Sequence, residues 1–165
     1  MTGEDRLYAD LTALGISYDV TEHEAVFTVE ESLALHELLP GAHTKNLFLK
    51  DAGGQFWLVT VPAEARVDLK ALPSAIGSKR ISFGKAEDME CLLGISPGSV
   101  TPLAAINDAE RQVKVVLDAS FAGRINVHPL RNTATLGLAT VDLIRALGHW
   151  GHDPIIATIP TLEAP

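Results

Sequence analysis

The chain has 165 residues, a net charge of −8 and a hydrophobic share of 47%; this length is typical of one domain and this composition of a globular protein in water. No apolar run is long enough to cross a bilayer, and the acidic, polar first ten residues do not form a signal peptide, so we expect no membrane partner. Cys91 is the single cysteine, which excludes an intrachain disulfide and favours a cytoplasmic location.

Charge is distributed unevenly along the sequence. Residues 1–40 contain nine acidic side chains and one basic side chain, whereas residues 45–85 contain seven basic and three acidic ones. A local basic surface, and not the net charge, binds phosphate groups. The middle of the chain is therefore compatible with RNA binding, although a scatter of solvated lysines is the commoner cause of so modest an excess.

Helical and extended patterns alternate in the first half of the sequence. Leucines at helical spacing stop at Gly15, and Thr28 and Glu31 have the spacing of a capping box at the start of a second helix. Two extended segments joined by Ala52-Gly53-Gly54 are typical of a hairpin. The pattern predicts helices at 4–14 and 29–39 and strands at 17–22, 44–51 and 55–61.

The second half is richer in short strands. Asp68 is placed to cap a short helix that Pro73 interrupts, Gly94 ends another helix, and Thr140 is placed to cap the last one. Helices and strands are interspersed without a strict βαβ repeat, which predicts a single α/β domain over residues 1–165, with a mixed, mostly antiparallel central sheet flanked by helices. The expected elements are helices at 85–93 and 140–148, a turn-rich loop at 95–102, and strands at 79–83, 113–118, 124–127, 133–138 and 154–159.

Several common catalytic patterns are missing. The sequence contains no glycine-rich nucleotide loop and no Gly-x-Ser-x-Gly motif. Cys91 falls among apolar helix residues, so we expect a small core residue. His149 and His152 stand three apart with no cysteine or third histidine nearby in the sequence, so we expect a solvent-facing pair at a helix end and no metal or cofactor. The histidines at 23, 36 and 43 are expected at the surface or as helix caps.

Lys45 and Asn46 form the most informative pair of the sequence. They stand at the entrance of a predicted strand whose next three residues, 47–49, are apolar. Such a strand has no structural need for a cation there, and a lysine held beside apolar surface loses solvation, so its amine becomes chemically adjustable. Lys45 is therefore the first candidate for chemistry, with an ordinary strand-end lysine as the alternative.

Five blocks of this sequence match blocks of a known superfamily, keep the same order, and together span nearly the whole chain. They are His-Thr-Lys-Asn-Leu-Phe-Leu at 43–49 with its hairpin, Val-Asp-Leu-Lys at 67–70, Lys-Arg-Ile-Ser-Phe at 79–83, Gly-Ser-Val-Thr-Pro at 98–102, and the segment 125–135. Together they resemble the YbaK-like superfamily of prolyl-tRNA editing domains. The sequence is most similar to its free-standing ProXp-ala branch, which hydrolyses alanine mischarged onto proline tRNA.

The resemblance implies roles for particular residues. Lys45 matches the superfamily's essential lysine, and Asn46 lies beside it in the catalytic site. The residues that the resemblance places at the substrate pocket are Gly98, Ser99, Pro102, His128, Phe27, Thr28 and Val29. The basic residues near the active strand that we expect to contact the tRNA are Lys50 and Arg80, followed by Lys79 and Lys85.

The implied reaction is hydrolysis of the ester that joins alanine to the terminal ribose of tRNA(Pro). The expected partners are the acceptor end of that tRNA and prolyl-tRNA synthetase. An ester is activated, so positioning a water and stabilising the oxyanion suffice without a covalent nucleophile. Lys45 supplies either a positive charge or, with a lowered pKa, a base, and we favour the cation. Asn46 is suited to orient the ester or a ribose hydroxyl.

Three alternatives remain open at this point. In the first, the protein hydrolyses the same kind of ester on another small mischarged residue, such as cysteine or serine. In the second, it is a non-catalytic module that retains the fold and binds tRNA or a synthetase. The third alternative, a small-molecule or metal protein built on His149 and His152, has the weakest support in the sequence.

Overall fold

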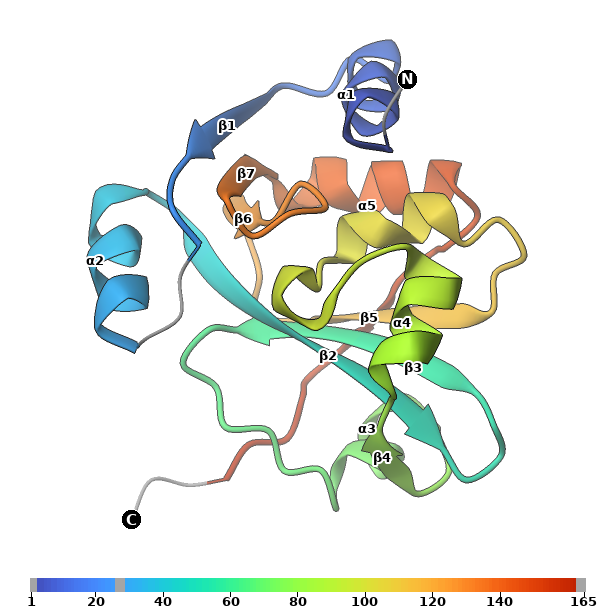
Figure 1. The fold of residues 1–165 in the computed structure, drawn as a ribbon. Helices are drawn as coiled ribbons and strands as arrows, with labels where there is room; N and C mark the ends of the chain where they lie inside the picture. The colour runs from blue at the N-terminus through green and yellow to red at the C-terminus, as the bar shows by residue number, and fades with distance from the viewer. Residues whose placement is uncertain (1–2, 26–28, 163–165) are drawn as a thin grey trace.

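The computed structural model describes residues 3–25 and 29–162. For residues 29–32 it describes the backbone but not the side chains. Helices and short strands alternate along this chain (Figure 1). The helices are α1 Gly3–Ala13, α2 Val29–Leu38, α3 Leu72–Ile76, α4 Ala86–Leu93 and α5 Thr140–His149, with 3-10 helices η1 Pro97–Ser99 and η2 Pro102–Asn107. The strands are β1 Tyr18–Glu22, β2 Ala42–Asp51, β3 Phe56–Pro62, β4 Ile81–Phe83, β5 Val113–Asp118, β6 Arg124–Val127, β7 Ala134–Ala139 and β8 Ile155–Ala157.

The strands form one mixed sheet in the order β1-β7-β6-β2-β3-β5-β8, and β4 pairs with β2 outside this order. The pairs β1–β7, β6–β7, β2–β3 and β2–β4 are antiparallel, whereas β2–β6, β3–β5 and β5–β8 are parallel. This arrangement confirms the predicted α/β class with a mixed, mostly antiparallel sheet flanked by helices. None of the described helices combines the length and apolar character that crossing a membrane requires.

Along one edge of strand β2, the paired strand changes from β6 to β4. Its other edge pairs with β3 from Thr44 to Lys50. On the changing edge, residues 42–43 pair in parallel with β6, and residues 49–51 pair antiparallel with β4. Among the described strands, none pairs with residues 45–47 on that edge. The sheet is therefore open on one side where the predicted residues Lys45 and Asn46 lie.

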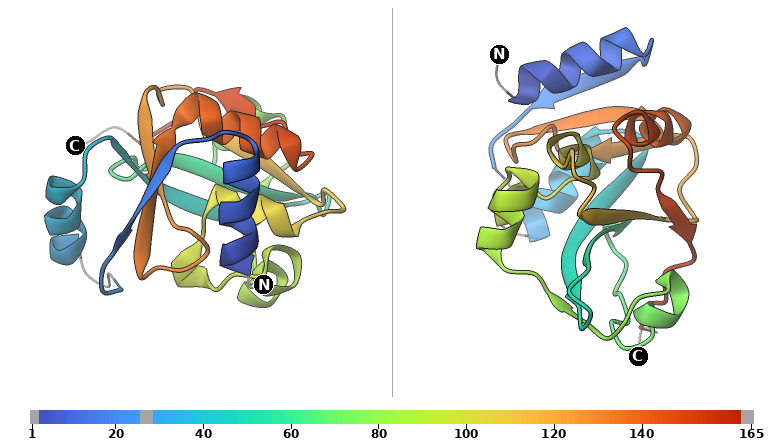
Figure 2. Two further views of the ribbon diagram at one scale, coloured as in Figure 1. Left: turned by 90° about the horizontal axis from the view of Figure 1, so that it is seen from above. Right: turned by 90° about the vertical axis from the view of Figure 1, so that its right-hand side faces the viewer.

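Apolar residues pack on both faces of the sheet, and β5 shows the division. Val115 and Leu117 pack into a cluster with α1, α5 and η2, whereas Val116 packs into a second cluster with α3. This split follows from the alternation of side chains along a strand. A third cluster joins β2 and β3 to α4 through Phe48 and Leu58. Figure 2 shows α1 and α3 at opposite ends of the molecule.

Two predicted helix caps are wrong. Asp68 accepts hydrogen bonds from the backbone of residues 70 and 71 in the turn before α3, and Ala71 occupies the N-cap position. Pro73 lies in the first turn of α3, where the missing N–H costs nothing, so it does not interrupt the helix. Thr140 is the first residue of α5, and its hydroxyl donates to the carbonyl of Gly123. The capping box proposed at Thr28 lies outside the described residues.

The hairpin between β2 and β3 is closed by the buried carboxylate of Asp51. This carboxylate accepts from the backbone N–H groups of Gly53 and Gln55 and from the indole of Trp57. Burial acts to raise the pKa of Asp51, but the hydrogen bonds from Trp57, Gln55 and Gly53 outweigh it and hold the pKa below its ordinary value. The turn thus fixes the register that positions Lys45 and Asn46.

Candidate functional site

A cavity of about 210 Å³ lies between the end of α2, the start of β2 and the strands β6 and β7. This volume lies below the roughly 300–1,000 Å³ that is typical of pockets for drug-sized ligands, so the cavity suits a small chemical group. Its described lining contains imidazole, hydroxyl, amide and aliphatic groups, with no carboxylate or ammonium among them. The lining residues are Leu35, His36, His43, Thr44, Asn126, Val127, His128 and Thr135.

The link between α2 and β2 is held by side chains from β6. Asn126 donates to the carbonyls of Pro40 (2.8 Å) and Ala42 (3.3 Å), and Arg124 Nε donates to the same Pro40 carbonyl (3.1 Å). Gly41 has a φ of +95°, and a Cβ there would meet Arg124. Glycine therefore lets the chain turn from the helix into the strand while pressed against β6.

His36 and His43 form the wall of the cavity on the α2 side. Their rings stack with centroids 4.0 Å apart, and His43 Nε2 lies 2.9 Å from the carbonyl of Leu39 at the end of α2. The predicted capping role of His43 therefore agrees with its position, but both rings also line the cavity, which the sequence did not indicate. Burial and the neighbouring His43 lower the pKa of His36, so this wall favours an uncharged ring at neutral pH.

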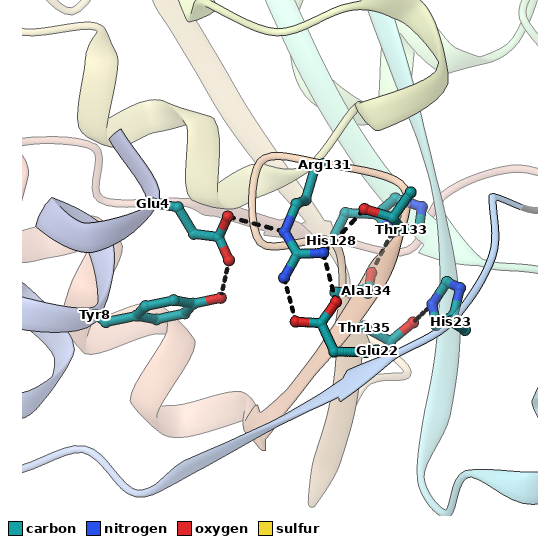
Figure 3. Close-up of polar contacts among 9 residues, drawn as sticks. All are labelled: Glu4, Tyr8, Glu22, His23, His128, Arg131, Thr133, Ala134 and Thr135. Carbon is teal, nitrogen blue, oxygen red and sulfur yellow. Dashed lines mark hydrogen bonds and ion pairs between the residues drawn. The ribbon is translucent and has the colours of Figure 1, made fainter. Parts of the chain in front are cut away.

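His128 presents one ring nitrogen to the protein. Its Nδ1 lies 3.1 Å from the carbonyl of Ala134, which accepts only, so Nδ1 carries the hydrogen (Figure 3). No described residue forms a hydrogen bond with Nε2. Burial lowers the pKa of His128 against the opposing hydrogen bond to Ala134, and nearby His23 lowers it further. The neutral ring therefore offers Nε2 as an acceptor in the wall of the cavity.

His23 reaches the same cavity indirectly. Its Nε2 lies 2.8 Å from the hydroxyl of Thr135, a lining residue, and its Nδ1 lies 2.7 Å from the carbonyl of Glu24 (Figure 3). The expectation of a surface or capping role is thus incomplete for His23, because its half-buried ring supports a side chain of the cavity wall.

Asn46 connects β2 to the loop at 98–102. Its amide nitrogen donates to the carbonyl of Val100 (3.1 Å), and its amide oxygen accepts from the hydroxyl of Thr60 on β3 (2.6 Å). One N–H and one lone pair of the amide remain for other partners. The structure therefore places Asn46 beside the predicted loop.

Lys45 lies on the opposite face of β2 from Asn46. Successive side chains of a strand alternate, so Lys45 shares the face of His43 and Asn46 shares the face of Thr44, and both of these neighbours line the cavity. Lys45 is half-buried opposite Val61, and its ammonium forms no hydrogen bond or ion pair with a described residue. It does not belong to the described lining of the cavity, so the structure places it next to the cavity and not inside it.

The loop at 98–102 lies between Asn46 and the segment that follows His128. Ser99 and Pro102 are buried in the short helices η1 and η2, and Gly98 is exposed. A Cβ on Gly98 would lie 3.1 Å from the amide nitrogen of Asn132. The structure therefore brings this loop close to the β6–β7 connection. Phe27 and Thr28 lie outside the described residues, and only the backbone of Val29, at the start of α2, is described.

The predicted tRNA contacts gather around the far end of β2. Lys50 lies opposite Ser82 of β4 in the antiparallel register, and its amine lies 5.2 Å from the ring centre of Phe56. Lys79, Arg80 and Lys85 flank β4 and are exposed, as is Lys50. With the described side chains, these four residues form no ion pair, so their charges face solvent.

Comparison with known proteins identifies the family. The model of the aminoacyl-tRNA editing domain matches residues 23–146. The chain belongs to this family. Prolyl-tRNA synthetase associated domain-containing protein 1 of Bos taurus is 40% identical over 153 residues, which cover 88% of this chain and 89% of the relative. Prolyl-tRNA editing protein ProX of Acetoanaerobium sticklandii is 36% identical over 146 residues, covering 87% and 89%.

Solved structures show the same fold. A crystal structure described as a candidate trans-editing enzyme for prolyl tRNA synthetase aligns with a TM-score of 0.70 and 18% identity, covering 97% of this chain and 99% of the other. At this identity the likeness shows the fold alone. The resemblance to prolyl-tRNA editing domains inferred from the sequence blocks is thereby confirmed at the level of the family and the fold.

Two other expectations about this editing domain are wrong. Cys91 is exposed on α4 and does not belong to the core. His152 is not solvent-facing, because its Nε2 lies 2.9 Å from a carboxylate oxygen of Asp108 and both side chains are 2% exposed. His149 is exposed as expected. Within the described part of the chain, no three histidine, cysteine or acidic side chains are grouped to hold a metal ion.

Of the eight described lining residues, sequence reasoning assigned only His128 to the site. Asn126 and Thr135 lie in the matching block 125–135 but were not assigned, and nothing in the local sequence of His36 indicated a site. His43 and Thr44 directly precede Lys45, and Asn126 stands two positions before His128, on the same face of the extended chain. That alternation was the available signal for this part of the lining.

Proposed function

We propose that the protein is a trans-editing deacylase that hydrolyses the ester between alanine and the 3′ end of tRNA(Pro). Its membership of the aminoacyl-tRNA editing family supports the reaction class, and relatives named for prolyl-tRNA editing support the tRNA. The observation that carries the proposal is the small cavity with uncharged polar walls beside Lys45. Prolyl-tRNA synthetase, which appears in the name of another relative, is the expected protein partner.

The size and chemistry of the cavity fit an aminoacyl group. A synthetase pocket built for proline rejects the smaller alanine weakly, since each methylene is worth about 1–3 kcal/mol, and a second pocket that is too small for proline corrects the error. Neutral imidazoles of His36 and His128 accept hydrogen bonds without repelling the ammonium group of the amino acid. In this proposal His128 Nε2 accepts from that ammonium or from the attacking water.

Lys45 supplies positive charge next to the cavity in this proposal. Its ammonium has no described partner in the protein, so it is free to meet the terminal phosphate or the developing oxyanion. Asn46 contributes mainly by holding the loop at 98–102 through Val100, because two of its hydrogen-bonding positions are occupied by the protein. The backbone of β2 at residues 45–47 pairs with no described strand on one edge, and in this proposal the substrate approaches along that edge.

The basic residues around β4 are proposed to bind the acceptor stem. A strand rises about 3.4 Å per residue, so Lys50 lies roughly 17 Å along β2 from Lys45. That spacing allows the single-stranded end of the tRNA to run along β2 toward the cavity. Arg80→Glu is expected to weaken tRNA binding and to lower its salt dependence. Unchanged deacylation at low salt in that variant would remove this docking surface from the proposal.

The decisive experiment measures deacylation of Ala-tRNA(Pro) and Pro-tRNA(Pro) by the wild type and by Lys45→Ala. We expect the wild type to act on Ala-tRNA(Pro) alone, and Lys45→Ala to lose about 10²- to 10³-fold in kcat, the usual effect of losing one group that stabilises the oxyanion. Lys70→Ala is the control, because Lys70 is an exposed lysine away from the cavity.

Other outcomes separate the remaining alternatives. Faster hydrolysis of Cys-tRNA or Ser-tRNA than of Ala-tRNA(Pro) would replace alanine as the substrate. Tight tRNA binding without hydrolysis of any mischarged tRNA would show a binding module. Full activity in Lys45→Ala would withdraw the role assigned to that ammonium.

A further inference from the structure

The loop that carries His128 adopts a backbone conformation that its residues do not favour on their own. It connects β6 to β7 and contains Leu130 with a φ of +73°, a left-handed conformation that a residue with a Cβ rarely adopts. The hydrogen bond between His128 Nδ1 and Ala134 joins the two ends of the loop, and Leu130 packs against the core. Other contacts must hold the middle of the loop, because strained residues persist only where their surroundings fix them.

Arg131 supplies those contacts with one side chain (Figure 3). Its Nη1 and Nη2 donate to the two carboxylate oxygens of Glu22 on β1 (2.7 and 2.6 Å), and its Nε donates to Glu4 on α1 (2.8 Å). Its Nη1 also donates to the hydroxyl of Thr133 in the same loop (2.9 Å). The planar guanidinium thus joins α1, β1 and the loop through four donated hydrogen bonds, one more than the three N–H groups of a lysine ammonium supply.

The two carboxylates are not equivalent. The side chain of Glu4 is 26% exposed and that of Glu22 is 71% exposed. Glu4 also accepts a hydrogen bond from Tyr8, whose ring stacks on Tyr18. Glu22 has the stronger bidentate geometry but is more screened by water, whereas Glu4 forms a single, more shielded bond, so both carboxylates contribute to holding Arg131.

We propose that Arg131 is a positioning residue: by binding Glu4 and Glu22 it holds the β6–β7 loop so that the imidazole of His128 keeps its place in the cavity wall. The structural part of this proposal concerns the position of His128 and stands without any activity. The kinetic part rests on the proposed deacylase function, because it assigns His128 to the aminoacyl group or the water.

The first measurement is nuclear magnetic resonance of the histidine rings. In Arg131→Met we expect the pKa of His128 to rise toward its ordinary 6.5, because the loosened loop exposes the ring, and its Nδ1 hydrogen to exchange faster with water. Arg145→Met is the matched control: Arg145 forms an ion pair with Asp142 within α5 and does not contact the loop. His128 is expected to titrate as in the wild type in this control.

The second measurement is deacylation kinetics. A misplaced catalytic group costs rate more than binding, so Arg131→Met is expected to lower kcat about tenfold or more while KM changes by about twofold or less. Glu4→Gln and Glu22→Gln are each expected to reproduce part of the loss, because each removes one of the two charged partners of Arg131. Arg131→Lys should fall between the wild type and Arg131→Met.

The outcomes are distinguishable. If Arg131→Met does not fold, Glu4→Gln and Arg131→Lys decide by the same two measurements. If His128 keeps its wild-type titration and hydrogen exchange in the folded variants, the positioning role is overturned, whatever the kinetics. If the wild type does not hydrolyse any mischarged tRNA, the proposed function fails, and the resonance measurements alone still support or overturn the role of Arg131.

Discussion

A buried and a half-buried histidine at different places in the fold show how this domain uses the same side chain differently. At the end of α5, His152 has both ring nitrogens close to oxygens of the protein: Nδ1 lies 3.2 Å from the carbonyl of Trp150, and Nε2 faces Asp108. At the cavity, His128 has Nδ1 on the carbonyl of Ala134 and Nε2 without a described partner. The protein provides partners for both nitrogens of the His152 ring, whereas in our proposal a ligand provides the partner of His128 Nε2.

The comparison teaches that burial alone does not identify a functional histidine. Buried polar groups are almost always hydrogen-bonded, because an unpaired one costs free energy. Among the described residues, no buried side-chain nitrogen or oxygen lacks a partner, so the unpaired Nε2 of His128 is an accessible atom that a partner from the cavity or from solvent can reach. Substitutions at His152 should therefore lower the free energy of unfolding and leave the deacylation rate nearly unchanged. Substitutions near His128 should lower the rate more than the stability.

The largest expected effect on stability comes from breaking the His152–Asp108 pair. Asp108 also accepts from the backbone of residues 112 and 113, so the pair fixes the start of β5 against the end of α5. His152→Ala is expected to lower the free energy of unfolding by about 2–4 kcal/mol, because it removes one hydrogen bond of a buried carboxylate and leaves a cavity where the imidazole packed. Urea unfolding measures this loss.

The exposed neighbour His149 provides the matched control. His149→Ala should change the free energy of unfolding by about 0.5 kcal/mol or less. Deacylation by folded His152→Ala protein in the cold should stay near the wild-type rate. A severe loss of rate without a loss of stability would break the comparison, because His152 would then serve the chemistry.

An intermediate effect is expected at Asn46, where structure and site overlap. Asn46→Ala leaves the Thr60 hydroxyl and the Val100 carbonyl without their partner, so the free energy of unfolding should fall by about 1–3 kcal/mol. The loop at 98–102 should also loosen, and kcat should fall in folded protein. Thr60→Val separates the two effects, because it removes the hydroxyl and keeps the bond to Val100. Equal kcat losses in both variants would contradict the assignment of the loop to Asn46.

The smallest expected effect is the pH dependence that His128 contributes to stability. Its pKa in the folded protein lies below 6.5, so the unfolded chain binds the proton first as the pH falls. The stability from the neutral ring is complete above about pH 6.5, declines as the pH drops below that value, and levels off below the folded pKa. Unfolding of the wild type and His128→Gln between pH 5 and 8 measures the difference, which should shrink toward low pH. A difference that grows toward low pH would contradict the lowered pKa.

Much of the fold could be predicted because its signals are local. Helical leucine spacing located α1, glycine ended α4, and the hairpin turn joined β2 to β3, since each depends on neighbouring residues. The caps at Asp68 and Thr140 were wrong because a side chain that can cap has several backbone groups in reach, and only the packed chain selects among them.

The candidate site was predictable only in part. The sequence blocks indicated Lys45, Asn46, the loop at 98–102 and His128, but no spacing indicated that Arg131 meets Glu4 and Glu22 more than a hundred positions away. Alternation along β2 was sufficient to separate Lys45 from Asn46, yet the pair was treated as one site at the strand entrance. The roles of these residues remain predictions for the experiments above.

The change of neighbour along β2 has a consequence for how this sheet tolerates growth. Extending β6 beyond Val127 or β4 beyond Phe83 by two or three residues would close the free edge at 45–47 with ordinary backbone pairing. Such an extension of β4 would add hydrogen bonds, yet it would cover the stretch that borders Lys45 and Asn46. An extension of β6 would in addition displace His128, which directly follows Val127. Access to this edge of β2 therefore sets an upper limit on the lengths of β4 and β6.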